Sequence, residues 1–501
     1  MHVLVTGGTG VVGKPAVDRL LERGHTVRLF SRNADRDARL WKSGVEPHPG
    51  DVGSAESVRG AAEGCDAVLH VVGIVDEHPP EATYENVNTE GTRRIVEEAA
   101  RAGVRRLVYV SSLGADTGES RYHRSKHAGE EIVRTFPGNW LILRPGNVYG
   151  PGDEVVSVLL KMMRTLPAMP TIGWGDQKFQ PVWAEDLATA LARAVESDEP
   201  SRSALDASGT EQVSVNEVLD RLEALTGRHP PRVPVPSQVA KAGAALADRV
   251  GVDLPINTDQ ITMLLEENVI RPGRANALVD VFGITPTPLD TGLALLADTL
   301  PEMLPSEGVG DLERHRYWAD IQGSACTADE LFELVRTDFP SLPPSGLLEA
   351  GAEPGALAAL EEGVTMTLAI PLRGHVQVRV EEVRDRTITA VTVEGHLLAG
   401  VIRFMVREIA SGVRFEVRSY FRPANLVDSV GLATVGGRLQ SATWRGMVEE
   451  VVRRSGGRAE EGAQEETEEL PHREAVRVER WVENLVQRRK REEGTVPGNG
   501  G

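Results

Sequence analysis

The sequence predicts an α/β fold with a doubly wound parallel sheet, followed by a separate α+β domain. Short β-branched runs alternate with longer helical patterns over residues 1–130, and a glycine-rich turn joins the first run to the first helix. Beyond residue 311 the pattern changes to successive alternating runs. Strand–helix alternation is typical of a parallel sheet with helices on both faces, whereas successive alternating runs are typical of an antiparallel sheet.

The first domain is expected to span residues 1–303. Its predicted strands are β-branched runs, and the segments between them have helical periodicity. The strands are expected at His2–Thr6, Thr26–Ser31, Ala67–Val72, Arg106–Ser111 and Trp140–Arg144, with helices such as Lys14–Arg23 and Thr89–Ala102. Within this domain, residues 151–300 contain shorter helices and proline-rich connections, which predict a smaller substrate-side lobe.

The second domain is expected to span residues 311–455. A strand, a helix and several alternating runs lead to one long helix, which predicts an antiparallel sheet wrapped around a C-terminal helix. The expected strands are His315–Gly323, Val364–Ile370, Val376–Val383, Thr387–Glu394, Val401–Glu408 and Val413–Phe421, and the expected helices are Thr327–Phe339 and Asn425–Arg454.

Residues 456–501 are expected to form a charged tail. Glycine and glutamate dominate it up to Leu470, and this composition predicts disorder. The segment His472–Arg491 then places its apolar residues on one helical face. This pattern predicts an amphipathic helix that docks onto its own protein or onto a partner.

Charge and composition exclude several classes of protein. The 501 residues carry a formal net charge of −19, which argues against binding to nucleic acid. The two cysteines, Cys65 and Cys326, fall in different predicted domains, so no disulfide framework is expected. No apolar run approaches the ~20 residues that span a bilayer, and no signal-peptide pattern opens the chain. We therefore expect a cytoplasmic protein without an integral membrane segment, and a homo-oligomer is compatible with this.

A glycine-rich turn, Thr6–Gly13, lies directly between the first predicted strand and the first predicted helix. Its glycines satisfy both G-x-G-x-x-G and G-x-x-G-x-x-G. Glycine permits a tight turn, close approach of pyrophosphate and close packing of helix on strand, while the helix N-terminus offers N–H groups to phosphate. A Rossmann-type dinucleotide site is therefore predicted. Its expected contacts in this turn are Gly7, Thr9, Gly10, Val11, Val12 and Gly13.

The end of the second predicted strand indicates which dinucleotide is preferred. An NAD site usually offers Asp or Glu near this point, whereas this chain has Ser31 followed by Arg32. A guanidinium suits a 2′-phosphate, so NADP(H) is the preferred cofactor and NAD(H) the alternative. The other interpretation of Arg32 is a solvated loop residue. At the end of the predicted strand Ala67–Val72, Val72 and Gly73 are expected to let the cofactor lie against the backbone.

A Y-x-x-x-K motif follows the predicted strand that ends in Ser111 and Ser112. Its two residues, Tyr122 and Lys126, share one helical face because they stand at i and i+4. The Lys126 ammonium is expected to lower the pKa of the Tyr122 phenol and to hold the nicotinamide ribose, so that the phenol acts as a general acid/base. A hydroxyl of Ser111 or Ser112 would polarise a substrate carbonyl.

Taken together, the motifs resemble those of a known superfamily. The matching segments are Thr6–Gly13, Gly50–Val52, Val87–Thr92, the V-S-S strand end, Y-x-x-x-K, Arg144–Gly152 and Phe179–Ala188. They are similar to the extended or atypical branch of the short-chain dehydrogenase/reductases (NAD-dependent epimerase/dehydratase-like), near the subgroup of the 39-kDa accessory subunit of respiratory complex I. The resemblance covers about residues 1–300.

This resemblance implies roles for the catalytic candidates. Tyr122 would be the acid/base, Lys126 the ribose clamp and activator, and Ser112 (or Ser111) the hydroxyl that positions the carbonyl. In one respect the chain departs from the extended members, which have a longer loop here. Ser112 and Tyr122 are only ten residues apart, which places Tyr122 at the very start of its helix.

The resemblance also adds cofactor contacts. An Asp-hydrophobic pair at the place of Asp51 and Val52 commonly meets the adenine in these proteins, and Pro145 belongs to a motif beside the cofactor. No metal is expected. His123 and His127 flank the Y-x-x-x-K motif, but no further metal-ligating residues accompany them in the sequence. His70 on its strand is interpreted as a core histidine with satisfied hydrogen bonds.

Residues 311–455 resemble the helix-grip (START/SRPBCC-like) superfamily, chiefly in topology. Glu394–Gly400 before a strand and Phe421–Ala424 before the final helix are similar to small bacterial members. The resemblance implies an apolar cavity for a lipid-like or aromatic ligand. The alternative is a filled core with a structural or oligomerising role.

Three functions follow from this sequence. The first is an NAD(P)(H)-dependent oxidoreductase that transfers hydride between nicotinamide and a carbonyl or alcohol in a small-molecule substrate, for which a hydrophobic molecule is one candidate. The second is a non-catalytic NADPH-binding assembly or sensor protein, because atypical relatives include proteins that bind NADP(H) without turnover. The third is a nucleotide-sugar epimerase or dehydratase, for which no nucleotide-sugar signature is evident.

Overall fold

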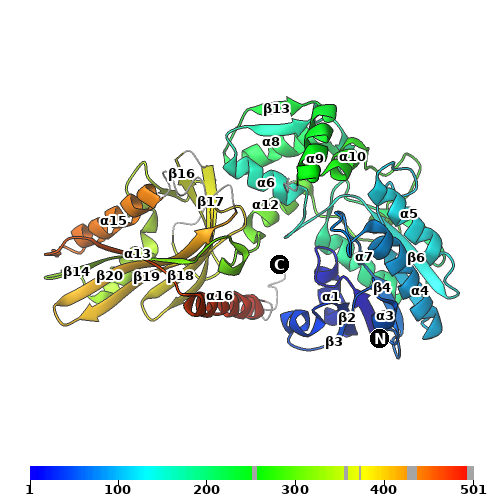
Figure 1. The fold of residues 1–501 in the computed structure, drawn as a ribbon, viewed down its shortest axis with the longest axis horizontal. Helices are drawn as coiled ribbons and strands as arrows, with labels where there is room; N and C mark the ends of the chain where they lie inside the picture. Colours follow the sequence, from blue (N-terminus) through cyan, green and yellow to red (C-terminus); the bar gives the residue numbers. More distant parts are fainter. Residues whose placement is uncertain (251–256, 355–358, 372–373, 426–436, 494–501) are drawn as a thin grey trace. The chain divides into compact units, whose positions relative to one another are not determined.

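The computed structural model describes residues 1–250, 257–354, 359–371, 374–425 and 437–493. The chain divides into two compact units (Figure 1). The first consists of Met1–Leu159, Ala168–Leu222 and Pro231–Ala297, and the second of Leu160–Pro167, Glu223–Pro230 and Asp298–Gly501. No helix in the described ranges is both long and apolar enough to cross a membrane.

Within the fully described residues 1–250, the first unit contains a seven-stranded parallel sheet in the order β11-β6-β5-β4-β1-β2-β3. The strands are β1 (His2–Thr6), β2 (Thr26–Ser31), β3 (Val45–Pro49), β4 (Ala67–His70), β5 (Arg106–Val110), β6 (Asn139–Pro145) and β11 (Ser203–Ala207). The order reverses at β1, so the carboxyl ends of β1 and β4 flank the crevice in which such sheets bind ligands. The predicted doubly wound fold is confirmed.

Helices cover both faces of this sheet because its strands are apolar on both sides. Val3 and Val5 of β1 pack with one layer, α1 (Gly13–Glu22), α7 (Ala184–Glu196) and α11 (Ala277–Asp280). Leu4, which points the opposite way, packs with α3 (Ala55–Val58), α4 (Glu90–Arg101) and α5 (Arg121–Val133). The short helix α2 (Ala34–Asp37) follows β2.

The later part of the first unit is built from short elements. Its two-residue to four-residue strands pair as β10-β7, β12-β9 and β13-β8. These are β7 (Val148–Tyr149), β8 (Met169–Ile172), β9 (Lys178–Phe179), β10 (Val182–Trp183), β12 (Val213–Ser214) and β13 (Arg232–Val235). The helices that begin in this part are α6 (Val156–Thr165), α8 (Val215–Thr226), α9 (Ser237–Val250), α10 (Thr258–Leu265) and α12 (Leu289–Thr299). The last residues of α6, α8 and α12 belong to the second unit.

The second unit is α+β, as predicted, with an antiparallel sheet of eight strands among the described residues, in the order β15-β16-β17-β18-β19-β20-β14-β21. The strands are β14 (Glu313–Ile321), β15 (Glu349–Ala350), β16 (Thr365–Ile370), β17 (Gly374–Arg384), β18 (Thr387–Thr392), β19 (Leu398–Ile409), β20 (Gly412–Pro423) and β21 (Gln464–Glu469). The helices are α13 (Ala328–Thr337), α15 (Gly437–Arg454) and α16 (His472–Glu493).

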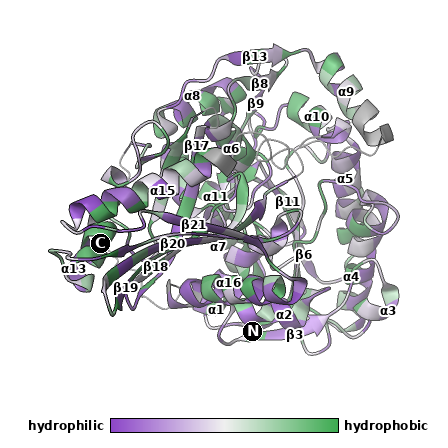
Figure 2. Ribbon diagram, turned by 60° about the vertical axis from the view of Figure 1, so that its left-hand side comes forward, coloured by the Kyte–Doolittle hydropathy of each residue, from purple (hydrophilic) through white to green (hydrophobic). Residues whose placement is uncertain are grey.

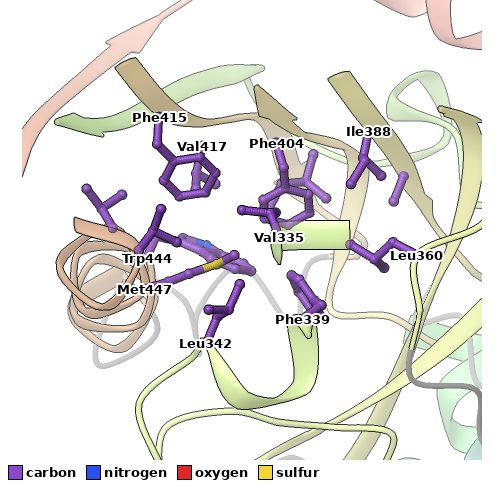
Figure 3. Packing of buried hydrophobic residues seen from close by; sticks show 14 of the residues in the cluster. Val335, Phe339, Leu342, Leu360, Ile388, Phe404, Phe415, Val417, Trp444 and Met447 are labelled. Atoms are coloured by element: carbon purple, nitrogen blue, oxygen red, sulfur yellow. The ribbon is translucent and has the colours of Figure 1, made fainter. Parts of the chain in front are cut away.

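One face of this sheet packs against α13 and α15 through an aromatic cluster (Figure 3). The Phe404 ring lies 5.2 Å from that of Phe339 and 5.9 Å from that of Trp444, in edge-on contacts. The ligand cavity implied by the helix-grip resemblance stays a prediction. The N-terminal part of the expected helix Asn425–Arg454 lies outside the described residues.

The opposite face is covered by α16, along which hydrophobic and hydrophilic residues alternate (Figure 2). Val482 and Val486 of this helix pack on Val391 and Val401 of the sheet. The amphipathic helix was predicted correctly, and its apolar face docks within its own unit.

The expectation of disorder up to Leu470 is wrong for β21. This glutamate-rich strand pairs antiparallel with β14 at the edge of the sheet. Arg316 of β14 contacts Glu466 at 2.6 Å, and Arg314 pairs with Glu468. Cross-strand pairs of opposite charge offset the repulsion among the glutamates, and composition alone does not show such partners.

Candidate active site

Two glycines of the turn after β1 are required by packing within the protein. Gly7 has a φ of +68°, and a Cβ there would lie 2.8 Å from the backbone N of Val72. A Cβ on Gly13 would overlap the carbonyl oxygen of Gly7. The close contact of α1 with the turn therefore depends on these two positions.

Gly10 differs from them because none of the described residues around it requires a glycine there. A Cβ at Gly10 would meet only the Gly7 carbonyl oxygen, at an ordinary 3.7 Å. Gly10 and Thr9 are exposed, and Val11 and Val12 are half-buried. The space in front of Gly10 is thus open to a ligand that approaches the backbone closely.

The start of α1 suits an anion. The helix begins at Gly13 without an acidic residue in its first turn, so its first amide groups and its dipole meet no competing carboxylate of that helix. The residues of this turn therefore fit the pyrophosphate of a dinucleotide.

At the end of β2, Ser31 and Arg32 have different surroundings. The Ser31 hydroxyl donates to a carboxylate oxygen of Asp37 at 2.7 Å. Arg32 is exposed, and it has no hydrogen bond or ion pair among the described residues. Its guanidinium is therefore available to a ligand.

The predicted adenine pair follows β3. The Asp51 carboxylate accepts a hydrogen bond from the backbone N–H of Gly53 at 2.7 Å, and Val52 is buried against Gly91 of α4. Pro145 ends β6 and is buried, and its carbonyl oxygen accepts from Leu113 at 2.7 Å. These contacts are structural, and the roles of these residues toward a cofactor remain predictions.

Lys126 and Gly73 lie side by side although they come from α5 and from the end of β4. A Cβ on Gly73 would stand 3.2 Å from the Lys126 Nζ. The ammonium donates to the carbonyl oxygen of Val110 at 2.7 Å and lies 4.5 Å from the centre of the Tyr109 ring. Burial lowers the pKa of Lys126 to about 7, against the opposite influence of Glu130.

Tyr122 is the second residue of α5, as the short connection from Ser112 predicts. Burial raises the pKa of its phenol to about 12, so the expected lowering of this pKa by Lys126 is wrong. The carboxylate of Glu154 adds to the upward shift, whereas the Ser112 side chain acts in the lowering direction.

Ser111 points elsewhere. Its hydroxyl donates to Glu130 at 2.7 Å in the interior. Glu130 also accepts two hydrogen bonds from Arg144, at 2.7 and 2.6 Å. Of the two serines left open by the sequence, Ser112 is therefore the one whose side chain influences Tyr122, and its hydroxyl donates to the carbonyl oxygen of Leu113 at 3.3 Å.

Asn88 is a site residue for which sequence reasoning assigned no role. It is fully buried, and its amide bonds both the N–H and the carbonyl oxygen of Ile74, at 2.8 and 3.0 Å. It also donates to the Ser125 hydroxyl at 3.0 Å. Asn88 thereby ties α5 to the loop after β4. In the sequence, the one indication of a role for Asn88 was its place within the family-like segment Val87–Thr92.

His70 is a core residue, as predicted. Its two ring nitrogens contact the hydroxyls of Thr6 and Thr92 at 2.7 and 3.0 Å. Burial lowers its pKa to about 3, so the ring is neutral.

Comparison with known proteins defines the class of the chain. Residues 3–205 match the model of the NAD dependent epimerase/dehydratase family, and residues 346–450 match a domain of unknown function (DUF1990). Sterol demethylase protein B of Methylococcus capsulatus is 30% identical over 269 residues, which cover 50% of this chain and 81% of that protein. The chain belongs to the NAD dependent epimerase/dehydratase family, and its first unit is an NAD(P)-binding Rossmann fold.

Two further relatives show the range of this family. A ceramide reductase of Caulobacter vibrioides is 34% identical over 191 residues, 38% of this chain and 59% of that protein. A mitochondrial NADH dehydrogenase [ubiquinone] 1 alpha subcomplex subunit 9 of Arabidopsis thaliana is 27% identical over 282 residues, 53% of this chain and 70% of that protein. The resemblance to the complex I subgroup is thus supported, and the helix-grip resemblance stays a prediction.

The glycine turn allows a matched pair of variants. Gly10→Ala should leave the melting temperature unchanged and weaken binding of nicotinamide cofactor, because the new methyl group occupies only ligand space. Gly13→Ala should lower the free energy of unfolding by about 1–3 kcal/mol, because its methyl group overlaps backbone. Thermal unfolding and cofactor calorimetry on both variants check this. Unchanged cofactor affinity in Gly10→Ala would contradict the pyrophosphate assignment.

The depressed pKa of Lys126 predicts a pH dependence of stability. Between about pH 7 and pH 10 the unfolded chain binds one more proton at this lysine than the native protein does. Stability of the wild type should therefore rise with pH there, relative to Lys126→Met, by up to about 1.4 kcal/mol per pH unit. Melting temperatures of both proteins at pH 7.0 to 9.5 test this. A constant difference between them would show that Lys126 titrates as it does in the unfolded chain.

Proposed function

We propose that the chain is an NAD(P)(H)-dependent oxidoreductase that transfers hydride between a nicotinamide and a carbonyl or alcohol substrate. One observation carries this proposal: Lys126 lies beside Gly73 at the end of β4, and one turn earlier on the same helix stands Tyr122, whose phenol is influenced by the Ser112 side chain. This arrangement adjoins the turn that fits a pyrophosphate. The reactive carbon of a bound nicotinamide and the phenol of Tyr122 would therefore reach the same substrate.

The protein residues would act on the substrate oxygen. Tyr122, whose phenol is kept protonated at neutral pH, would donate its proton to the oxygen of a carbonyl substrate. The Ser112 hydroxyl would donate a hydrogen bond to the same oxygen and polarise the bond. The Lys126 ammonium would hold the ribose and favour loss of the phenol proton. A bound nicotinamide would supply the hydride to the carbonyl carbon.

The activities named for several relatives support a reductase. They include a ceramide reductase, a 3-beta-hydroxysteroid dehydrogenase and a 2-alkyl-3-oxoalkanoate reductase.

A non-catalytic NADPH-binding role is the second candidate. The similarity to a mitochondrial complex I subunit supports it. So does the engagement of the Lys126 ammonium by the Val110 carbonyl oxygen, because this contact competes with a ribose.

Tyr122→Phe separates the two candidates. In a reductase the variant should lose activity by about 10²–10⁴-fold, because the proton donor is gone, and it should bind NADPH as tightly as wild type. NADPH oxidation with a panel of aldehydes, ketones and quinones, together with calorimetry, measures both quantities. Ser112→Ala should also slow turnover, with the affinity for NADPH unchanged, because the hydroxyl that polarises the carbonyl is gone. If wild type binds NADPH and turns over no member of the panel, the non-catalytic role is preferred.

We propose in addition that NADP(H) is preferred over NAD(H), because Arg32 offers an unengaged guanidinium at the end of β2. Arg32→Ala should weaken NADPH binding about tenfold or more and leave NADH binding within about twofold, since only NADPH carries the 2′-phosphate. Arg36→Ala is the control, as this exposed arginine already contacts Asp37 at 3.4 Å. Equal losses for both cofactors in Arg32→Ala would contradict the preference.

A further inference from the structure

We propose that residues 257–268 are a positioning brace, in which the carboxylates of Asp259 and Glu266 hold the start of α5 and so place Tyr122 against Ser112. The inference rests on the proposed function in one respect, namely that Tyr122 is the proton donor. The brace consists of α10 with its flanking residues, and it is more than 130 residues distant in sequence from the helix that it holds.

Asp259 binds the backbone of the proton donor itself. One of its carboxylate oxygens accepts from the N–H of Arg121 at 2.9 Å, and the other accepts from the N–H of Tyr122 at 3.0 Å. These are first-turn amides of α5, which have no partner within the helix. A charged acceptor shared by two amides fixes the helix start more firmly than water does.

Glu266 holds the residues just before the helix. Its Oε1 accepts from the N–H of Glu119 at 2.6 Å and from that of Ser120 at 3.0 Å. Its Oε2 lies 2.6 Å from the Nδ1 of His123, a side chain that is 3% exposed. Asp259 and Glu266 thus engage consecutive amides from Glu119 to Tyr122.

The residues at the two ends of the brace bind two further loops of the site. Asn257 donates from its side chain to Asp76, in the loop after β4, at 2.6 Å. Asn268 donates from its side chain to the carbonyl oxygen of Leu113, which adjoins Ser112, at 2.8 Å. The loop after β4, the loop after β5 and the start of α5 therefore share one brace.

The brace has internal restraints that make it a fixed support. Asn257 and Gln260 form a capping box at the start of α10, with hydrogen bonds of 2.8 and 2.9 Å. At the other end, the backbone of Asn268 bonds to Lys178 and to Gln180, at 3.1 and 2.9 Å. Restraints at both ends keep Asp259 and Glu266 from following a displaced α5.

The position of Tyr122 explains why a brace is needed. Helix ends fray, and a proton donor in the first turn lacks the anchoring that an interior position provides. Lys126, one turn further on, is 2% exposed, whereas Tyr122 is only half-buried. The carboxylates of Asp259 and Glu266 therefore restrain Tyr122 where the helix itself does not. This restraint matters because a small displacement of a reacting group greatly lowers the reaction rate.

The test uses the full chain with NADPH bound. Asp259→Ala and Glu266→Ala should each lower kcat about tenfold or more, with the affinity for NADPH within about twofold of wild type. Amide hydrogen exchange at residues 119–123 should be about tenfold faster or more, and exchange in β1 and β5 unchanged. Asp259→Asn keeps one acceptor oxygen and should recover part of the rate.

Glu330→Gln is the matched control, because Glu330 accepts from the N–H of Thr327 at 2.8 Å at the start of a helix in the other unit. It should change neither kcat nor exchange at residues 119–123. If the alanine variants behave like this control, or if NADPH affinity falls in step with kcat, the proposal is overturned. If wild type turns over no substrate, the proposed reductase function fails, and hydrogen exchange alone decides whether the brace orders Tyr122.

Discussion

The buried ion pair of Glu130 with Arg144 is the constraint on which the candidate site depends. Glu130 is fully buried, and it accepts two hydrogen bonds from Arg144 of β6, one from Ser111 and one from Arg134. A buried carboxylate is tolerated only when its oxygens are satisfied in this way, and removing one partner leaves a costly unpaired charge. The pair therefore fixes the rotation and height of α5 against the strand ends.

The rotation of α5 decides what its other residues face. Lys126 stands one turn before Glu130 and shares its face, so the ammonium is directed inward, onto Val110 and beside Gly73. Tyr122 stands one turn earlier again, where the sheet ends and Ser112 begins the loop. The packing that buries Lys126 also lowers its pKa, so the same geometry that places the lysine makes it a group that titrates near neutrality.

The parts of this structure that local patterns dictate could be predicted from sequence. The turn Thr6–Gly13, the parallel strands and the i, i+4 pair of Tyr122 and Lys126 are local patterns of this kind. The choice between Ser111 and Ser112 could not be made, because it depends on a carboxylate that comes from α5. The brace was also beyond sequence reasoning, since Asp259 and Glu266 have the pattern of solvated helix residues and their partners lie elsewhere in the chain.

Burial bears on the direction of the proposed proton transfer. A helix N-terminus carries a partial positive charge, which by itself would stabilise a phenolate at Tyr122 and lower its pKa. Burial opposes this effect and raises the pKa of the phenol to about 12, with a further upward contribution from the carboxylate of Glu154. Tyr122 is therefore held as a neutral phenol, which is the form that donates a proton. The packing around the residue thus suits it to reduction of a carbonyl, and in the reverse direction the ammonium of Lys126 would have to overcome this effect of burial.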